Sequence, residues 1–298
     1  MAPLTGIVNK DITIDPSSKF DMRDKTVLIV GGTSGLGQAL AKEAASEGAN
    51  VTVIGRAFKD DPNQINFVQA DLSLMKEAKR IGETVEPAEI VVLTVGIIAH
   101  PTRVVSDEDI EMDLAVSYLS RLVILKYLVP RLSKGSRVFI MGFPGANVKD
   151  FKLDDLNAES SYNSMGFVHG NTINGNEALV LDWAAKTKAE DVAFFGLNPG
   201  LIKTGIRNNQ YAAGIMAYLG PVIEFLLGIL SPSPESYAKE IVPLLFTKGL
   251  EQYSGSMFNP QAKPTLKSAH FEEDKELAKK FVDRSEALVK AKAAIDLA

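Results

Sequence analysis

The sequence predicts a single-domain α/β protein built on a doubly wound parallel sheet, and two observations support this. First, short apolar runs recur along the 298-residue chain, separated by longer segments with helical periodicity. The strands of a parallel sheet are covered by helices on both faces, so they read as continuous apolar runs of this kind. Second, a composition of 46% hydrophobic and 23% charged residues is typical of a soluble globular protein.

The elements are predicted in chain order. Residues 1–24 carry Pro, Asp and Ser without periodicity, which predicts a surface leader, and the sheet starts near Lys25. We expect strands at residues 26–30, 51–54, 66–70, 90–95, 138–141 and 192–197, and helices that include residues 37–45, 117–132 and 237–245. The dinucleotide-type domain then spans residues 25–265. Residues 266–298 form a C-terminal helical segment, in which 271–297 read as one amphipathic helix for packing or dimerisation.

Composition and charge exclude several classes of protein. The absence of cysteine excludes disulfides, thiolate nucleophiles and cysteine-based zinc sites, and three dispersed histidines predict no metal centre. A net charge of −5 argues against a nucleic-acid partner, because phosphate binding needs a cationic surface. The N-terminus lacks the features of a signal peptide, and no apolar run reaches the roughly 20 residues of a membrane span. We therefore expect a cytoplasmic protein with a small-molecule partner.

A glycine-rich turn follows the first predicted strand. Gly31, Gly35 and Gly37 lie where a turn needs unusual backbone dihedrals and where a pyrophosphate can approach the backbone. The helix after the turn offers free N–H groups and the positive end of its dipole. Strand, turn and helix thus occur in the order that a dinucleotide site requires, which predicts cofactor binding. A purely structural glycine turn is the alternative.

The spacing G-x-x-x-G-x-G resembles that of the short-chain dehydrogenase/reductase family, and further motifs follow in the family's order. Asp71-Leu72 comes after the third predicted strand, Thr94-Val95-Gly96 stands where the family has Asn-Asn-Ala-Gly, and residues 198–204 match P-G-x-x-x-T. The resemblance covers residues 25–259 and implies a nicotinamide dinucleotide as cofactor. The residues it assigns to cofactor binding are Gly31, Thr33, Ser34, Gly35, Leu36, Gly37, Arg56, Asp71, Leu72, Thr94, Val95, Gly96, Pro199, Gly200, Ile202 and Thr204.

The second predicted strand ends in Gly55-Arg56, where NAD-preferring members of the family carry an acidic residue. Without that acid, and with a guanidinium available to pair with a phosphate, the resemblance implies NADP(H). Arg56 as an ordinary surface charge is the alternative.

The catalytic residues of the family are replaced. In the family a tyrosine donates the proton, a lysine lowers the pKa of that tyrosine and holds the ribose, a serine orients the carbonyl and an asparagine supports a water relay. In this sequence the four positions fall on Thr172, Asn176, Gly142 and Ser117. A positioned general acid contributes roughly 10²–10⁴-fold to the rate. The ordinary chemistry of the family should therefore fail unless another group supplies the proton.

His169 is the first candidate for that group. If the helix already runs at His169, then His169, Thr172 and Asn176 lie at i, i+3 and i+7 and point into one cleft. The ordinary pKa of histidine, about 6.5, suits proton donation at neutral pH. Tyr118 is the second candidate, and a surface or capping role for His169 is the alternative.

Four further polar residues near these positions carry weaker expectations. We expect His100 in a loop and Tyr162 either lining the pocket or packing in a loop. Glu177 and Asp182 fall outside the His169 face of the helix and are predicted to be solvated.

The family builds its substrate lid after Thr204, and the lid falls here at about residues 205–235. Its apolar stretch, 215–230, predicts a hydrophobic substrate. An oligomer contact or a membrane-surface contact is the alternative. We predict an NADPH-dependent oxidoreductase of a hydrophobic carbonyl or related unsaturated compound, with a non-standard proton donor and a possible homo-oligomeric state. The competing hypothesis is a protein of this fold that binds the cofactor without redox turnover, as a rearrangement or cyclisation enzyme or as a sensor.

Overall fold

In the computed structural model, which describes residues 22–59, 65–200, 202 and 232–297, eight strands form one sheet in the order β3-β2-β1-β4-β5-β6-β7-β8. Six of them correspond to the predicted strands: β1 (Thr26–Val30), β2 (Asn50–Gly55), β3 (Ile65–Gln69), β4 (Ile90–Leu93), β5 (Ser136–Met141) and β6 (Val192–Leu197). Two short strands, β7 (Met257–Phe258) and β8 (Pro264–Thr265), extend the sheet beyond β6. All neighbours are parallel except β7 and β8. The predicted fold class is confirmed.

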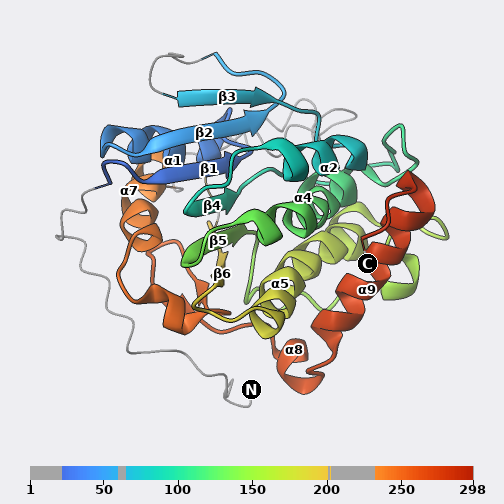
Figure 1. Cartoon of the computed structure of the whole chain (residues 1–298). Coiled ribbons are helices and arrows are strands. Elements are labelled where there is room, and N and C mark those ends of the chain that lie inside the picture. Colours follow the sequence, from blue (N-terminus) through green and yellow to red (C-terminus); the bar gives the residue numbers. More distant parts are fainter. Residues whose placement is uncertain (1–21, 60–64, 201, 203–231, 298) are drawn as a thin grey trace.

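Helices cover both faces of the sheet (Figure 1). Helices α1 (Gly35–Ser46) and α7 (Pro234–Leu245) lie on one face, and α2 (Met75–Thr84), α4 (Ser120–Leu128), α5 (His169–Lys186) and α9 (Leu277–Ala293) lie on the other. Successive side chains of a strand point to opposite faces. In β1, Leu28 and Val30 therefore join the core under α2, α4, α5 and α9, whereas Val27 and Ile29 join the core under α1 and α7.

The predicted helix over residues 117–132 starts earlier than expected. A short α3 (Met112–Leu114) leads into a π-helical turn, η1 (Ala115–Leu119), and then into α4. A second π-helical turn, η4 (Ser164–Val168), precedes α5. Such wider turns are rare and occur often at functional sites, because they change which side chains a helix presents to a cleft. The remaining helical turns are η2 (Val129–Arg131), η3 (Leu153–Asp155) and η6 (Leu250–Tyr253).

The C-terminal segment forms two helices, so the prediction of one helix over residues 271–297 was wrong. Helix α8 (Ala269–Glu273) ends one residue before Asp274, and α9 begins at Leu277. The Asp274 carboxylate accepts a hydrogen bond from the N–H of Glu276 at 3.0 Å. Aspartate competes for backbone N–H groups in this way, which favours a break and a new helix start. Helix α9 packs along α5 and closes that side of the core.

Two predicted segments lie outside the described residues. They are nearly all of the leader (1–21) and nearly all of the lid (203–231), and Thr204 falls in the second of them. Within the described residues, no helix is both long and apolar enough to cross a bilayer.

Candidate active site

A cavity of about 330 Å³ opens at the carboxyl ends of β4, β5 and β6, and Leu36 of α1 lines its β1 side. The sheet order reverses direction between β1 and β4, and ligands of open α/β sheets bind at such a switch point. Eleven residues from the predicted site line this cavity: Leu36, Thr94, Gly96, Ser117, Gly142, His169, Thr172, Asn176, Pro199, Gly200 and Ile202. Most of the other lining residues are apolar, among them Ile97, Ile98, Phe143, Met165 and Ile173.

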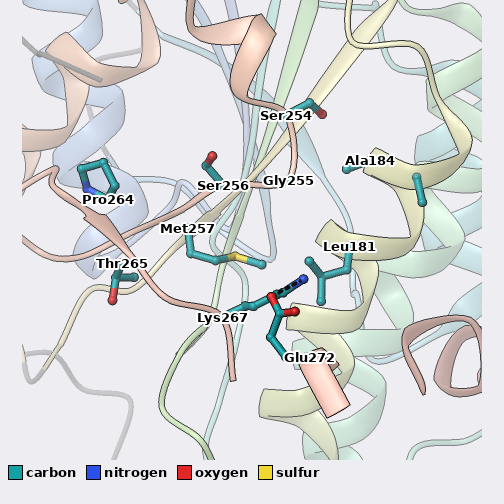
Figure 2. Close-up of a pocket in the computed structure, with 11 residues that line it drawn as sticks. Leu181, Ala184, Ser254, Gly255, Ser256, Met257, Pro264, Thr265, Lys267 and Glu272 are labelled. Atoms are coloured by element: carbon teal, nitrogen blue, oxygen red, sulfur yellow. Dashed lines mark ion pairs between the residues drawn. The ribbon is translucent and has the colours of Figure 1, made fainter. Parts of the chain in front are cut away.

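A second cavity, of about 350 Å³, lies beside α5 at the β7–β8 edge (Figure 2). Leu181 of α5 faces Met257 and Thr265 of the two edge strands there. Its two charged side chains already form an ion pair, because Lys267 Nζ lies 2.8 Å from Glu272 Oε1. None of the predicted site residues lines it. The cavity at the ends of β4, β5 and β6 is therefore the candidate active site.

The glycine turn forms a close-packed cradle at the start of α1. Gly31 adopts φ +91°, and a Cβ atom there would lie 2.4 Å from the backbone nitrogen of Val95. A Cβ atom on Gly37 would lie 2.3 Å from the Gly31 carbonyl oxygen. Both positions therefore require glycine. Ser34 precedes the helix in an extended conformation and its side chain does not cap it, which leaves the helix N-terminus open to an anion. The cradle fits the pyrophosphate of a dinucleotide.

Arg56 and Asp71, which are predicted to bind the cofactor, lie outside this cavity. Arg56 follows the end of β2 and is exposed. Thr33 of the glycine turn packs on the same end of β2, where a Cβ atom on Gly55 would lie 2.6 Å from its Oγ1. Asp71 is also exposed, and its Oδ1 accepts a hydrogen bond from Ser73 Oγ at 2.8 Å. Arg56 thus stands one residue beyond the strand end on which the phosphate-binding turn packs.

Half-buried His169 pairs with the buried Asp113 at the cavity wall. His169 Nδ1 lies 2.7 Å from Asp113 Oδ2, and Ser117 Oγ donates to Asp113 Oδ1 at 2.6 Å. The N–H of Ile97 donates to Ser117 Oγ at 2.8 Å, which ties the pair to the chain after β4. Because Asp113 occupies Nδ1, Nε2 is the ring nitrogen left to exchange a proton with a ligand in the cavity.

The electrostatics of this pair favour the protonated imidazole. Burial lowers the pKa of His169, but the charge of Asp113 and its hydrogen bond outweigh burial, so the pKa is raised above its ordinary value of 6.5. The charge of Glu111, the residue that caps the start of α3 by accepting the N–H of Leu114, also raises the pKa of His169. Burial and the charge of Asp113 raise the pKa of Glu111 itself to about 7. The cavity therefore holds a histidine suited to donate a proton near neutral pH.

The predicted helical face is present, since α5 begins at His169 and brings His169, Thr172 and Asn176 to the cavity. Thr172 Oγ1 is buried and has no hydrogen-bond partner among the described residues. The Asn176 amide is committed to the protein, because Nδ2 donates to the carbonyls of Ser117 at 2.9 Å and Thr172 at 2.8 Å. A Cβ atom on Gly142 would lie 3.2 Å from Asn176 Cβ, so the two predicted tetrad positions are adjacent.

The prediction of Tyr118 as a second proton donor was wrong. Its ring is fully buried against α9, where Tyr118 Oη lies 2.9 Å from Ser285 Oγ and the ring packs edge-on against Phe281. Burial raises its pKa well above the ordinary value of 10. A Cβ atom on Gly175 would lie 2.8 Å from the same ring, which explains a glycine inside α5. Tyr118 supports the helix packing and does not face the cavity lining.

Glu177 and Asp182 are buried, so the prediction that they are solvated was also wrong. Glu177 accepts hydrogen bonds from Ser268 Oγ at 2.7 Å and from the N–H of Gly145 at 3.1 Å, and thereby fastens the chain before α8 and the chain after β5 to α5. Asp182 pairs with Lys186 Nζ at 2.6 Å.

Tyr162 donates to the carbonyl of His100 at 2.8 Å, which places both residues in a packed loop away from the cavity lining.

Two functional candidates were missed by sequence reasoning. Asp113 precedes Ser117 by one helical turn and Arg121 follows it by one turn, so all three share a face once the helix is extended back to Met112. The signal was Arg121, an arginine directly before the apolar run Leu122–Leu125 of the predicted helix over residues 117–132. Of the described residues that line the cavity, only His169 and Arg121 have ionisable side chains.

Comparison with known proteins identifies relatives over most of the chain. A family model described as short chain dehydrogenase matches residues 25–142. The uncharacterized oxidoreductase YKL107W of Saccharomyces cerevisiae is 40% identical over 297 residues, covering 94% of each chain. Mouse retinol dehydrogenase 14 is 23% identical, covering 90% of this chain and 86% of its own. Among solved structures, an uncharacterized protein of Mycobacterium paratuberculosis superposes with a TM-score of 0.69 at 19% identity, covering 96% of this chain and 98% of its own.

Proposed function

Because the chain belongs to the short-chain dehydrogenase/reductase family, we propose that it is an NADPH-dependent reductase of apolar carbonyl compounds in which His169 donates the proton. The observation that carries this proposal is the His169–Asp113 pair at 2.7 Å in the wall of the candidate cavity. The tyrosine and lysine positions of the family hold Thr172 and Asn176, which have no ionisable proton near neutral pH. His169 is the group in the described cavity wall that is able to take over proton transfer.

The cofactor part of the proposal rests on the glycine cradle and the uncapped start of α1. The cradle holds the pyrophosphate, and Thr94, Gly96, Pro199 and Gly200 stand along the cavity toward β5 and β6, where the nicotinamide half belongs. When bound, the reduced nicotinamide supplies the hydride. The protein's own share of the work is to orient the carbonyl compound, keep water out and deliver a proton to the carbonyl oxygen.

His169 and Thr172 carry that share on adjacent turns of α5. Protonated His169 donates from Nε2, while Asp113 holds Nδ1 and fixes the plane of the ring. The Thr172 hydroxyl has no partner among the residues that the structure describes, so we expect it to donate to the same carbonyl oxygen and orient it. Ser117 fixes Asp113 from the other side. The proton thus comes from the His169 imidazole, and the buried Asp113 carboxylate stabilises its charged form.

The substrate side of the cavity is apolar. Ile97, Ile98, Phe143 and Ile173 line it, and Met165 stands 60% exposed among the lining residues. Such a surface favours a bulky hydrophobic ligand with a single polar group. The relatives named retinol dehydrogenase and daunorubicin C-13 ketoreductase are consistent with this class. Retinal and aromatic ketones are therefore the first compounds to assay.

Reduction is tested on the purified full-length protein by following NADPH absorbance with a panel of hydrophobic aldehydes, ketones and enones. We expect oxidation of NADPH with at least one apolar carbonyl compound. Tight binding of NADPH without turnover on any compound would favour a cofactor-binding protein with no redox role, which the replaced tetrad positions also allow. Conversion of a compound without net oxidation of NADPH would identify a rearrangement enzyme.

Preference for NADPH over NADH is expected to depend on Arg56. An arginine–phosphate contact contributes about 1.5–3 kcal/mol, so Arg56→Ala should weaken NADPH binding about 10- to 100-fold and leave NADH binding within about twofold. Dissociation constants from nucleotide fluorescence measure both. Lys59→Ala removes an exposed cation three residues further on and should change neither constant. Equal affinity of the wild-type protein for NADH and NADPH would show that Arg56 is an ordinary surface charge.

A further inference from the structure

Arg121 places a buried guanidinium in the wall of the active-site cavity. The residue is 3% exposed and lines the cavity. Burying a cation costs several kcal/mol unless an anion or good acceptors compensate it. Within the described part of the chain, its hydrogen-bond acceptors are all neutral: the carbonyl oxygens of Val95 and Met141 and the side-chain oxygen of Asn176. Burial lowers the pKa of Arg121 to about 9, while the charge of Asp113 acts in the opposite direction, so the group is still a cation at pH 7.

The hydrogen bonds of this guanidinium leave one donor for a ligand. Nε donates to the Val95 carbonyl at 3.2 Å, and Nη2 donates to the same oxygen at 2.5 Å. Nη1 uses both of its N–H groups, one on the Met141 carbonyl and one on Asn176 Oδ1 at 2.7 Å. An arginine carries five N–H donors, so the second N–H of Nη2 has no acceptor among the described residues. A Cβ atom on Gly96 would lie 3.6 Å from Nη2, which places this nitrogen beside another residue of the cavity wall.

The position of Arg121 in the sheet indicates which part of a dinucleotide it would meet. Val95 follows β4 and Met141 ends β5, so the guanidinium bridges the carboxyl ends of these neighbouring strands. Adjacent strands are about 4.8 Å apart. The pyrophosphate cradle lies between β1 and β4, so Arg121 stands about one strand spacing further along, toward the nicotinamide half and His169.

We propose that Arg121 is the fixed cation of the nicotinamide half of the site, and that its Nη2 N–H donates to a hydroxyl of the nicotinamide ribose. This inference rests on the proposed function, because it requires a nicotinamide dinucleotide in the cavity. Asn176 acts as a positioning residue: its Oδ1 holds Nη1, while its Nδ2 is anchored to the Ser117 and Thr172 carbonyls. The positive charge of Arg121, which belongs to α4, thus lies beside Asn176, the residue at the predicted position of the family's lysine.

Ligands that share only part of the dinucleotide test this assignment. Calorimetric dissociation constants are compared for NADPH and for 2′,5′-ADP, which has the adenosine ribose and its phosphate but no nicotinamide ribose. In Arg121→Met we expect NADPH binding to weaken about 10- to 100-fold, corresponding to the loss of a charged hydrogen bond. The affinity for 2′,5′-ADP should stay within about twofold. Arg121→Lys should recover part of the loss, since it keeps the charge.

Controls separate this inference from a structural role and from the proposed function. Arg131→Met removes an exposed cation that donates to the Gly82 carbonyl, and it should leave both constants unchanged. Equal losses for NADPH and 2′,5′-ADP in every folded Arg121 variant would overturn the assignment in favour of general packing. Unchanged NADPH affinity in these variants would overturn it too, while leaving the proposed function intact. If circular dichroism shows that Arg121→Met is unfolded, the same two dissociation constants are measured for Arg121→Lys and Arg121→Gln, and these values decide the assignment. A wild-type protein that binds neither NADPH nor NADH would refute both proposals.

Discussion

Replacing His169 with asparagine is expected to lower kcat for NADPH-dependent reduction by about 10²–10⁴-fold. The amide nitrogen of asparagine is able to donate to Asp113 in place of Nδ1 of the imidazole. The amide has no ionisable proton near neutral pH, however, so it cannot act as the acid. NADPH binding should stay within about twofold, because the glycine cradle and Arg121 are untouched. Steady-state rates and nucleotide fluorescence measure the two effects separately.

Thr172→Val is the matched control for this experiment. It removes a hydroxyl that has no hydrogen-bond partner in the described part of the chain, one turn further along α5, while nearly conserving volume. We expect a smaller loss, about 10-fold or less, because the hydroxyl orients the carbonyl without supplying the proton. Turnover that survives in His169→Asn and is lost in Thr172→Val would assign the proton to a group other than the imidazole.

Substituting Gly37 with alanine is expected to lower the affinity for NADPH strongly. The added Cβ atom would lie 2.3 Å from the Gly31 carbonyl oxygen and 2.4 Å from Thr94 Oγ1, far inside van der Waals contact. Helix α1 must then move away from β1 and β4, which opens the cradle and misplaces the N–H groups meant for the pyrophosphate. We expect NADPH affinity to fall by about 100-fold or more, and stability to fall by about 1–3 kcal/mol from overpacking.

A surface position on the same helix controls for this substitution. Lys42 is exposed on α1, so Lys42→Ala should alter stability by less than about 0.5 kcal/mol and leave NADPH affinity unchanged. Denaturant unfolding and fluorescence titration of both variants give the comparison. Near wild-type NADPH affinity in Gly37→Ala would mean that the glycine turn does not cradle the cofactor.

The strands were predictable because both faces of this sheet are buried. In β1 and β6 every position from Val27 to Val30 and from Val192 to Leu197 is buried, so each strand is a continuous apolar run in the sequence. The glycine turn was predictable for a similar reason: close backbone approach and positive φ restrict the residue type locally. Both features depend on residues that are close together in the sequence, so a single sequence is enough to predict them.

The polar network of the site depends on contacts between helices that are far apart in the sequence. The sequence predicted His169 and Asn176 as site residues but not their partners Asp113 and Arg121. Asp113 and His169 are 56 residues apart, and Arg121 and Asn176 are 55 apart. Single-sequence periodicity says which face of a helix is apolar but not which polar side chain meets another helix. Tyr118 shows the limit most clearly, since it neighbours Ser117 in sequence and yet packs against α9.

Glu177 was misjudged for the same reason. Its carboxylate is buried because the chain before α8 folds back over α5 and supplies N–H and O–H donors from Ser268. Ser268 lies 91 positions away and Gly145, the other donor, 32 positions away, so the environment of Glu177 could not be inferred from the helix alone.

The pH dependence of kcat tests the central claim, that a histidine held by Asp113 replaces the family's proton donor. The acid is the protonated imidazole, so the wild-type rate should fall as pH rises through the pKa of His169, which lies above 6.5. Asp113→Asn removes the charge that raises this pKa, so the midpoint should move to lower pH. Glu111→Gln should shift the midpoint less, because the charge of Glu111 raises the pKa of His169 less than Asp113 does. A profile that is flat from about pH 6 to 9 in the wild-type protein, or one that Asp113→Asn leaves unchanged, would contradict the assignment of His169 as the proton donor.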